Sequence, residues 1–339
     1  MRLRHGVGLL AAVLAVAGCT AGSPTGPAST GPAPTGTAPT GVAQPTASAA
    51  PSAPVTCANP EASYPPLPSL PPPQALPAGS LERAIQARHR LVVGVAADTR
   101  LLGARNPFTG EIEGFDIDMA RAVAKAIFGD PKKIEFKVIT VADRIKQVNA
   151  GVAHGGVDLV ARAMTVNCER WTKVAFSSVY FRAQQRVLVR SDAEDHGIHG
   201  IEDLARAKAK VCAPDGSTSL AKLTDYPGVV PVGVVQNADC LALFQEGKVD
   251  AITGDDAILA GFKVQDPYAV VVGEPLEPEP YGLAIAKGQV AFVRFVNAVL
   301  DRVRSSGQWN ASYQQWLGPG LQVDPPPHPP TPNYGRAIP

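Results

Sequence analysis

The stretch 88–318 alternates between short β-branched runs and segments with helical apolar spacing. Its first part has extended runs at 90–97, 133–139 and 157–161, separated by helical patterns at 115–128 and 143–150. Repeated alternation of strand and helix is typical of mainly parallel sheets that are covered by helices. The sequence therefore predicts an α/β fold.

A second set of alternating elements follows the first. It opens with an extended run at 185–189 and closes with a strand at 269–272, and a long amphipathic helix comes later at 290–305. Two sets that separate near 184 and rejoin near 276 indicate two lobes, with the chain crossing between them twice. Ligands of open α/β sheets bind beyond the carboxyl ends of the strands, so we expect a binding cleft between the lobes.

Prolines mark where this fold begins and ends. Of 33 prolines, 16 lie between residues 20 and 80 and 8 lie after 318, which leaves 9 for the segment 81–318. Residues 20–60 carry no charge, and such a segment buries too little apolar surface to offset the entropy of ordering it. We expect 19–80 to be a disordered tether and 319–339 to be a proline-rich tail.

The first residues have the pattern of an export signal. Arg2 and Arg4 precede a short apolar run that ends in Ala17-Gly18-Cys19. A cysteine after Ala-Gly resembles the lipobox of bacterial lipoproteins. That resemblance implies a signal peptide at 1–18, a diacylglycerol on the Cys19 sulfur, and anchorage to the outer leaflet of the cell membrane. An ordinary signal peptide is the alternative.

Charge and hydropathy argue against several classes of protein. There are 31 Lys and Arg against 30 Asp and Glu, and a net charge of +1 argues against a nucleic-acid-binding protein, which needs a clustered basic surface. No apolar stretch approaches the roughly 18 residues of a membrane span. No group of Cys and His has the spacing of a metal site, so we expect neither a metal nor a cofactor.

Once Cys19 is set aside, four cysteines remain, an even number that suits an oxidising compartment. Four cysteines allow three pairings. Cys212 ends an expected strand and Cys240 lies in the helix just downstream, which favours a local disulfide between them. Cys57 would then pair with Cys168 and pin the end of the tether against the domain.

Several motifs follow one another with a characteristic order and spacing over almost all of 88–318. They are Arg90–Gly94, Gly110–Asp118, Thr165–Arg170, Gly216–Ser219, Val249–Asp256, Tyr281-Gly282 and Ser306–Gly318. Together they resemble the polar-amino-acid solute-binding proteins of ABC transporters. With the lipobox and the cysteines, the chain is most similar to actinobacterial glutamate/glutamine-binding lipoproteins.

This resemblance implies a type II periplasmic-binding-protein fold. Lobe 1 would comprise 81–184 and 277–318, and lobe 2 would comprise 185–276. A two-stranded hinge joins the lobes in such proteins, and they close around one free amino acid.

The α-carboxylate of an amino acid needs a partner when it leaves water, because an unpaired buried charge is severely unfavourable. An arginine suits this group, since it can donate two parallel hydrogen bonds. The resemblance gives the role to Arg170, with the Thr165 hydroxyl and the Ala163 backbone beside it. Ser217 and Thr218 stand at an expected helix start in lobe 2 and offer backbone N–H groups.

The α-ammonium of the ligand needs a carboxylate. The resemblance places Asp255 there, directly after the expected strand 250–253, and Asp256 then reads as the N-cap of the following helix. The alternatives are a surface ion pair for Arg170 and a helix cap for Asp255.

Further cations are expected near the side chain of the ligand. In relatives that bind glutamate and aspartate, an arginine at the position of Arg144 meets the side-chain carboxylate. Arg162 ends a run that otherwise resembles a buried strand, so its charge must face the cleft or pair with a protein carboxylate. Arg100 lies at the cleft rim or in solvent, and Leu102 stands where relatives place an aromatic. Three cations beyond Arg170 favour a ligand with a second negative charge.

We therefore expect a monomeric, membrane-anchored, extracytoplasmic receptor and no enzyme. Its ligand would be glutamate or aspartate, with glutamine and asparagine weaker, and its partner an ABC permease. One open alternative is a sensor that reports amino-acid supply to a membrane signalling protein. A remote one is a cyclic-acid dehydratase, which would need a general acid in the cleft; Asp98 and His154 are the residues to consider.

Overall fold

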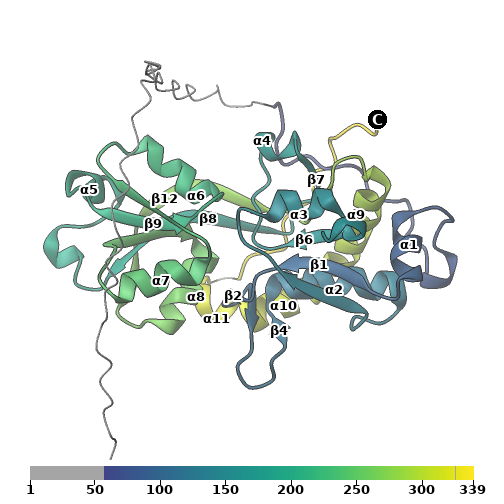
Figure 1. The fold of residues 1–339 in the computed structure, drawn as a ribbon, viewed down its shortest axis with the longest axis horizontal. Coiled ribbons are helices and arrows are strands. Elements are labelled where there is room, and N and C mark those ends of the chain that lie inside the picture. Colours follow the sequence, from purple (N-terminus) through teal and green to yellow (C-terminus); the bar gives the residue numbers. More distant parts are fainter. Residues whose placement is uncertain (1–56, 325) are drawn as a thin grey trace, which may run out of the picture. The chain divides into compact units, whose positions relative to one another are not determined.

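The computed structural model describes residues 57–324 and 326–339, in which two five-stranded sheets form the centres of two lobes (Figure 1). The expected signal peptide, Cys19 and the tether up to residue 56 lie outside the described residues. No helix of the described part is long and apolar enough to cross a membrane.

The sheet of lobe 1 has the strand order β5-β1-β6-β13-β7. Its strands are β1 (Leu91–Val95), β5 (Ile134–Val138), β6 (Leu159–Ala161), β7 (Val174–Phe176) and β13 (Ala284–Ala286). Every residue of β1 is buried because the sheet is covered on both faces, which explains its uninterrupted apolar run. The main helices of this lobe are α2 (Phe115–Phe128), α3 (Arg144–Ala150) and α9 (Val290–Ser305).

The sheet of lobe 2 has the order β10-β9-β11-β8-β12. Its strands are β8 (Phe181–Arg190), β9 (Lys210–Pro214), β10 (Val230–Val234), β11 (Ala251–Asp255) and β12 (Ala269–Tyr281). Its helices are α5 (Ile201–Arg206), α6 (Thr218–Lys222), α7 (Asn237–Gln245) and α8 (Asp256–Gln265). The expected alternation of strands and helices is confirmed in both lobes.

Both sheets are mixed rather than mainly parallel. β8 runs antiparallel to β11 and β12, and β13 runs antiparallel to β6 and β7. The reason is the double crossing: the strand that enters lobe 2 and the strand that leaves it point in opposite directions. A pattern of apolar residues does not reveal this reversal.

The two crossing strands form the expected two-stranded hinge. Residues Phe181–Gln185 of β8 pair antiparallel with Glu277–Tyr281 of β12, after a register shift between Val272 and Glu277. Tyr281 also forms a bridge with Thr165 of lobe 1. The end of the hinge is thus built into the first lobe.

Short elements that the apolar pattern did not predict complete the fold. A three-stranded sheet contains β2 (Asp98–Thr99), β3 (Gly103–Arg105) and β4 (Ile112–Glu113). The remaining helices are α1 (Leu81–Ala87), α4 (Cys168–Trp171), α10 (Gln308–Trp316), α11 (Gly318–Leu321) and the 3-10 turns Pro73–Ala75, Val152–His154, Glu194–His196 and Leu223–Asp225.

The described part of the expected tether, residues 57–80, differs from the expected disorder because it packs on lobe 1, and the proline-rich tail packs on lobe 1 as well. The Ser63 hydroxyl is buried and donates to the Phe176 carbonyl at 2.8 Å, and the Asn297 amide donates to the Tyr64 carbonyl at 2.7 Å. At the other end, the Tyr334 hydroxyl donates to Asp301. Proline has no N–H and a fixed φ, so a proline-rich segment can lie extended on a surface with few donors to satisfy.

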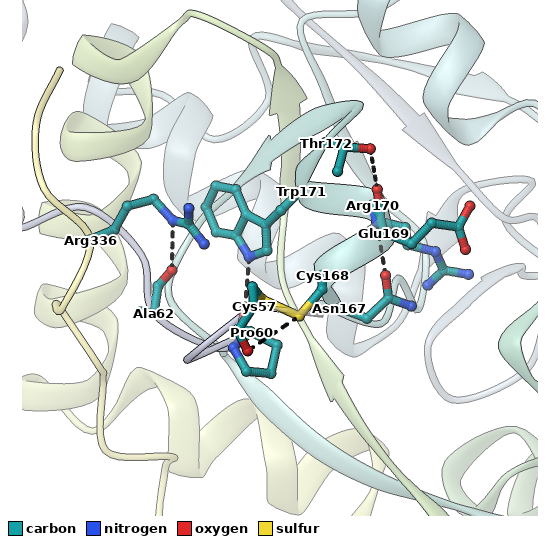
Figure 2. Close-up of a disulfide and its surroundings, with 10 residues drawn as sticks. All are labelled: Cys57, Pro60, Ala62, Asn167, Cys168, Glu169, Arg170, Trp171, Thr172 and Arg336. Carbon is teal, nitrogen blue, oxygen red and sulfur yellow. Dashed lines mark hydrogen bonds between the residues drawn. A yellow bond between two sulfur atoms is a disulfide. The ribbon is translucent and has the colours of Figure 1, made fainter. Parts of the chain in front are cut away.

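Two disulfides are present, with the pairing that the sequence favoured. Cys212 of β9 joins Cys240 of α7, and Cys57 joins Cys168 at the start of α4 (Figure 2). The Cα atoms are 5.6 Å apart in each pair. The second disulfide fixes the beginning of the described chain to lobe 1.

Candidate ligand-binding cleft

A cleft lies between the lobes, beyond the carboxyl ends of β6, β9 and β11. Its lining from lobe 1 is Val141, Arg144, Arg162, Ala163 and Thr165, and its lining from lobe 2 is Pro214, Ser217, Thr218, Ser219, Asn237, Gly254, Asp255 and Ile258. Seven of the ten expected ligand-binding residues are in this lining. Arg170, Arg100 and Leu102 are not in the lining, although Nη2 of Arg170 lies 3.4 Å from the carbonyl of Gly216, next to the lining residue Ser217.

Arg170 sits on α4 and is buried rather than part of a surface ion pair. Its Nη1 donates to the Thr165 carbonyl at 2.8 Å, and its Nη2 points to the Gly216 carbonyl of lobe 2 at 3.4 Å. The Asn167 side chain caps α4 by accepting from the Arg170 N–H at 2.9 Å. Burial lowers the pKa of Arg170, and the nearby carboxylates of Glu279 and Asp255 oppose that shift.

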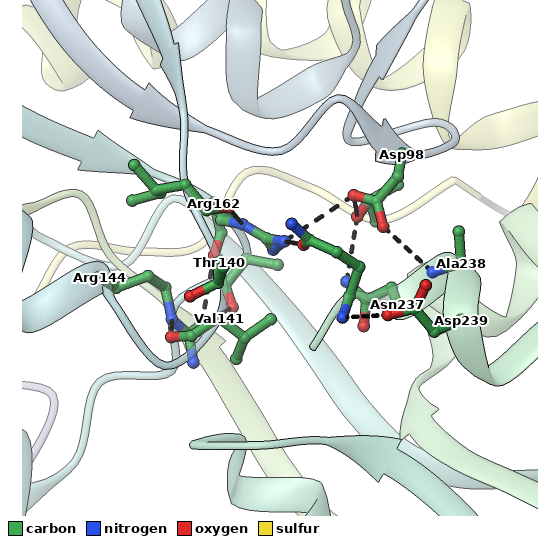
Figure 3. A network of polar contacts seen from close by, with 12 residues as sticks. Asp98, Thr140, Val141, Arg144, Arg162, Asn237, Ala238 and Asp239 are labelled. Carbon is green, nitrogen blue, oxygen red and sulfur yellow. Dashed lines mark hydrogen bonds and ion pairs between the residues drawn. The ribbon is translucent and has the colours of Figure 1, made fainter. Parts of the chain in front are cut away.

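Arg144 begins α3 and is held entirely by backbone carbonyls (Figure 3). Its Nε donates to Val141 at 2.8 Å and its Nη1 to Ala163 at 2.9 Å, while its Nη2 lies 3.3 Å from the carbonyl of Gly216. These oxygens satisfy the donors without neutralising the charge. Burial, followed by the charges of Arg170 and Arg162, lowers the pKa of Arg144 well below its ordinary value.

Arg162 faces the cleft and also has protein partners. Its Nε donates to the Ile139 carbonyl at 2.9 Å, and its Nη2 donates to the Gln236 side chain from lobe 2. Asp98 lies 3.8 Å away and accepts from the Ala238 N–H of lobe 2 at 3.1 Å (Figure 3). This network therefore links the two lobes at the rim of the cleft.

The backbone of Ala163 is already occupied. Its φ of +39° is unusual for a residue other than glycine, and its N–H donates to Asp116 at 2.8 Å. Asp116 also accepts from the Tyr180 hydroxyl at 2.6 Å, and burial raises its pKa to about 6. The sequence led us to expect the Ala163 backbone beside the ligand carboxylate. Ala163 does line the cleft, but its N–H is already bonded to Asp116.

Ser217 and Thr218 stand at the start of α6. The Ser217 hydroxyl caps the helix by accepting from the Leu220 N–H at 3.0 Å, and the Ser217 N–H donates to the Pro214 carbonyl at 3.2 Å. The Thr218 hydroxyl lies 3.3 Å from that of Thr165, across the cleft. The two threonines therefore mark the point at which the lobes meet.

Asp255 ends β11 and precedes α8, but its side chain does not cap that helix. Instead it accepts from the Tyr281 hydroxyl and from the Ser219 hydroxyl, the latter at 3.4 Å. Burial raises the pKa of Asp255 to about 6. Asp256, which the sequence suggested as the cap, accepts from the Ala257 N–H next to it, and the backbone of Gln184 also donates to it.

Glu279 is a site residue that sequence reasoning missed. It is fully buried on the hinge strand β12, and its Oε2 accepts from Thr165 of lobe 1 and, at 2.9 Å, from Thr218 of lobe 2. Burial and the nearby Asp255 raise the pKa of Glu279 to about 8. One signal was available: Glu279 lies two residues before Tyr281, on the same face of an extended strand.

Arg100 and Leu102 do not reach the cleft. Leu101 has a φ of +75°, and the chain reverses there between β2 and β3. Leu102 is consequently buried in the core, where its carbonyl accepts from the Asp116 N–H at 3.0 Å. Arg100 lines a separate groove together with Phe108. The expected cleft position of Leu102 was wrong because a turn reversed its direction, and for Arg100 the solvent-exposed alternative is the one that the structure has.

Residues 91–319 match the sequence model of the bacterial extracellular solute-binding proteins, family 3. The chain belongs to this family. As a member, it is an extracytoplasmic solute receptor and not an enzyme, as the sequence predicted. Its cleft lies beyond the carboxyl ends of the strands, where open α/β sheets generally bind ligands.

Several curated relatives of this solute-binding protein are similar over most of their length. The ABC transporter glutamine-binding protein GlnH of Bacillus subtilis is 38% identical over 235 residues, which are 69% of this chain and 83% of the relative. The glutamate-binding protein GluB of Corynebacterium glutamicum is 31% identical over 237 residues, covering 67% and 78% of the two chains.

Solved structures have the same fold. A solute receptor for L-cysteine from Neisseria gonorrhoeae aligns with a TM-score of 0.66 at 25% identity, over 72% of this chain and 97% of the other. An ancestral arginine-binding protein bound to glutamine aligns with a TM-score of 0.62 at 31% identity, over 68% and 99%. The expected type II periplasmic-binding-protein fold is therefore confirmed.

Proposed function

We propose that this solute-binding protein captures glutamate or aspartate and delivers it to an ABC transporter. Glutamine and asparagine are the weaker ligands in this proposal. The names of the relatives support the class, since one binds glutamine for an ABC transporter and another binds glutamate. The preference for an acidic side chain is argued from the charges in the cleft.

The observation that carries this preference is a pair of buried arginines without an anionic partner. Among residues 57–324 and 326–339, no carboxylate oxygen lies within 4.0 Å of the guanidinium nitrogens of Arg144 or Arg170. A buried charge without a counter-charge is unfavourable, so two such groups favour a ligand with two carboxylates. We assign the α-carboxylate to Arg170 and the side-chain carboxylate to Arg144 and Arg162.

Protonation of Glu279 strengthens the preference. Burial and the nearby Asp255 raise the pKa of Glu279 further than burial raises the pKa of Asp116 or Asp255, so Glu279 is the carboxyl that most favours its neutral form. Of the three buried arginines, Arg162 has Asp98 at 3.8 Å, which leaves Arg144 and Arg170 without a carboxylate that close. An amino acid with a net charge of −1 offsets the remaining positive charge.

The α-ammonium is assigned to Asp255, which is buried in the lining of the cleft. Thr165 and Thr218 lie beside it and bring one hydroxyl from each lobe. Closure would then be favoured because the ligand contacts both lobes only in the closed form, and a ligand shifts such an equilibrium by its difference in affinity for the two forms.

Calorimetric titration with glutamate, aspartate, glutamine and asparagine tests the proposal. We expect the two acids to bind most tightly, and Arg170→Ala or Asp255→Ala to weaken them by about 100-fold or more, as for a buried charge that loses its partner. Arg302→Ala is the matched control, since this arginine is exposed on α9 and outside the cleft. Tightest binding by glutamine would overturn the acidic preference, and unchanged affinity in both cleft variants would overturn the site.

Lipid anchorage and transport are the remaining parts of the proposal. We propose that Cys19 carries the lipid and that the protein acts as a monomer. Cys19→Ala should release the protein from the membrane fraction, and retention there would contradict the anchor. A strain that lacks the protein should lose glutamate uptake; intact uptake with an altered signalling response would favour the sensor instead.

A further inference from the structure

The helix that carries Arg170 is too short to hold itself in place. α4 has four residues, Cys168–Trp171, and even its N-cap Asn167 provides only one side-chain hydrogen bond. Helices of this length are unstable on their own because nucleation is costly. The position of Arg170 must therefore be fixed by what packs around α4.

The first residue of α4 is fixed covalently. Cys168 is bonded to Cys57, 111 residues earlier in the sequence and at the edge of the described chain. Figure 2 shows that the segment following Cys57 runs beside α4. One end of the helix is thus tied to a segment outside the α/β fold.

The last residue of α4 is held by both flanks of the chain at once. The Trp171 indole N–H donates to the Pro60 carbonyl at 2.7 Å. The guanidinium carbon of Arg336 lies 3.6 Å from the centre of the Trp171 ring, and its Nε donates to the Ala62 carbonyl at 3.0 Å (Figure 2). A guanidinium over an indole is the most favourable cation–π pairing.

The two flanks also hold each other. The Ser63 N–H donates to the Asn333 carbonyl at 2.9 Å, and the Arg336 N–H donates to the Ser63 carbonyl at 3.1 Å. We call residues 57–63 and 333–336 together the brace. The brace contacts α4 at both of its ends, with Arg170 between them.

We propose that the brace positions Arg170 for the ligand carboxylate, so that Cys57, Cys168, Trp171 and Arg336 are positioning residues for binding. The inference rests on the proposed role of Arg170. A two-pronged hydrogen bond to a carboxylate depends strongly on geometry, and a misplacement of about 1 Å can cost up to 100-fold. Terminal segments that lie outside the family's α/β fold would in this way set the affinity of its cleft.

Two brace variants test this in the full-length protein: Arg336→Gln, and the pair Cys57→Ser with Cys168→Ser. We expect each to weaken glutamate binding about tenfold in calorimetry. Arg83→Gln is the matched control, because the same exchange removes an exposed arginine of α1 that donates to Gln86 and lies outside the brace. It should change the affinity less than twofold.

A double-mutant cycle with Arg170→Lys separates positioning from general stability. Lysine cannot form the two-pronged bond, so Arg336→Gln should weaken binding less than about twofold in the Arg170→Lys background. Equal losses in both backgrounds, or unchanged affinity in both brace variants, would overturn the brace. Full affinity in Arg170→Ala would instead overturn the proposed function, so the two failures are distinguishable.

Discussion

Glu279 should make the protein less stable as pH rises, and the substitution Glu279→Gln should remove this pH dependence. Its native pKa of about 8 lies above the ordinary value of 4.5. Between these values the folded state keeps a proton that the unfolded state has lost, so stability falls as pH rises through this window. Glutamine resembles the protonated carboxyl in shape and in hydrogen bonding and does not titrate.

The contribution of Glu279 to the free energy of unfolding is clearest between pH 6 and 8. Asp116, Asp255 and Asp256 have native pKa values of about 6, so their contributions fall mainly below that range. One group that stays protonated only in the folded state lowers the free energy of unfolding by about 1.4 kcal/mol per pH unit. The wild type should therefore lose roughly 2–3 kcal/mol from pH 6 to pH 8, and Glu279→Gln should lose much less.

Urea denaturation of the ligand-free protein at pH 6, 7 and 8 measures this difference. In a thermal scan the same loss corresponds to a fall of about 5–10 °C for a domain of this size. Glu277→Gln is the matched control, since Glu277 lies on the same strand but is exposed and pairs with Lys222. Equal pH slopes for wild type and Glu279→Gln would refute a protonated carboxyl at the hinge.

Three further outcomes are expected. Gly216→Ala should weaken ligand binding at least tenfold in calorimetry, because a Cβ there would lie 2.9 Å from the Ala142 Cα of the opposite lobe. Gly197→Ala is the control, since Gly197 has a similar positive φ with open space around it, and this variant should bind normally. Equal affinity in both variants would contradict a closed cleft. Replacing Cys212 and Cys240 by serine should lower the free energy of unfolding by about 3–4 kcal/mol in urea, the value for a loop of this length, and no loss would contradict a stabilising disulfide. Glutamate binding near pH 7.5 should take up a fraction of a proton, because a ligand of net charge −1 favours the neutral form of Glu279. The uptake would appear as heats that differ between phosphate and Tris buffers, and identical heats or a net release of protons would argue against it.

Long periodic segments were predictable from the sequence. The pattern at 115–128 gave the bounds of α2, because one face of this helix is buried in the core and the αL residue Gly129 ends it. Arg162 and Asp255 were also placed at strand ends, Arg162 from the buried run before it and Asp255 through the family resemblance.

Short and non-local features were not predictable in the same way. α4 has no apolar period to recognise, and its place is set by segments more than 100 residues away. Leu102 points inward because the preceding residue, Leu101, has a positive φ. Turn propensities do not predict a positive φ for leucine. Glu279 was missed because its burial depends on two threonines from different lobes.

The attachment of both flanks of the described chain to the same half of the molecule has a practical consequence. Residues 60–66 and 333–336 share hydrogen bonds with one another and with lobe 1, and Glu61 accepts from Arg182 at the base of the hinge. Opening of the cleft would therefore leave these hydrogen bonds intact, and lobe 2 would move relative to lobe 1 and the two flanks. A fluorophore at Pro339 would stay with lobe 1, so a second dye on α5 of lobe 2 would report ligand binding as a change in energy transfer.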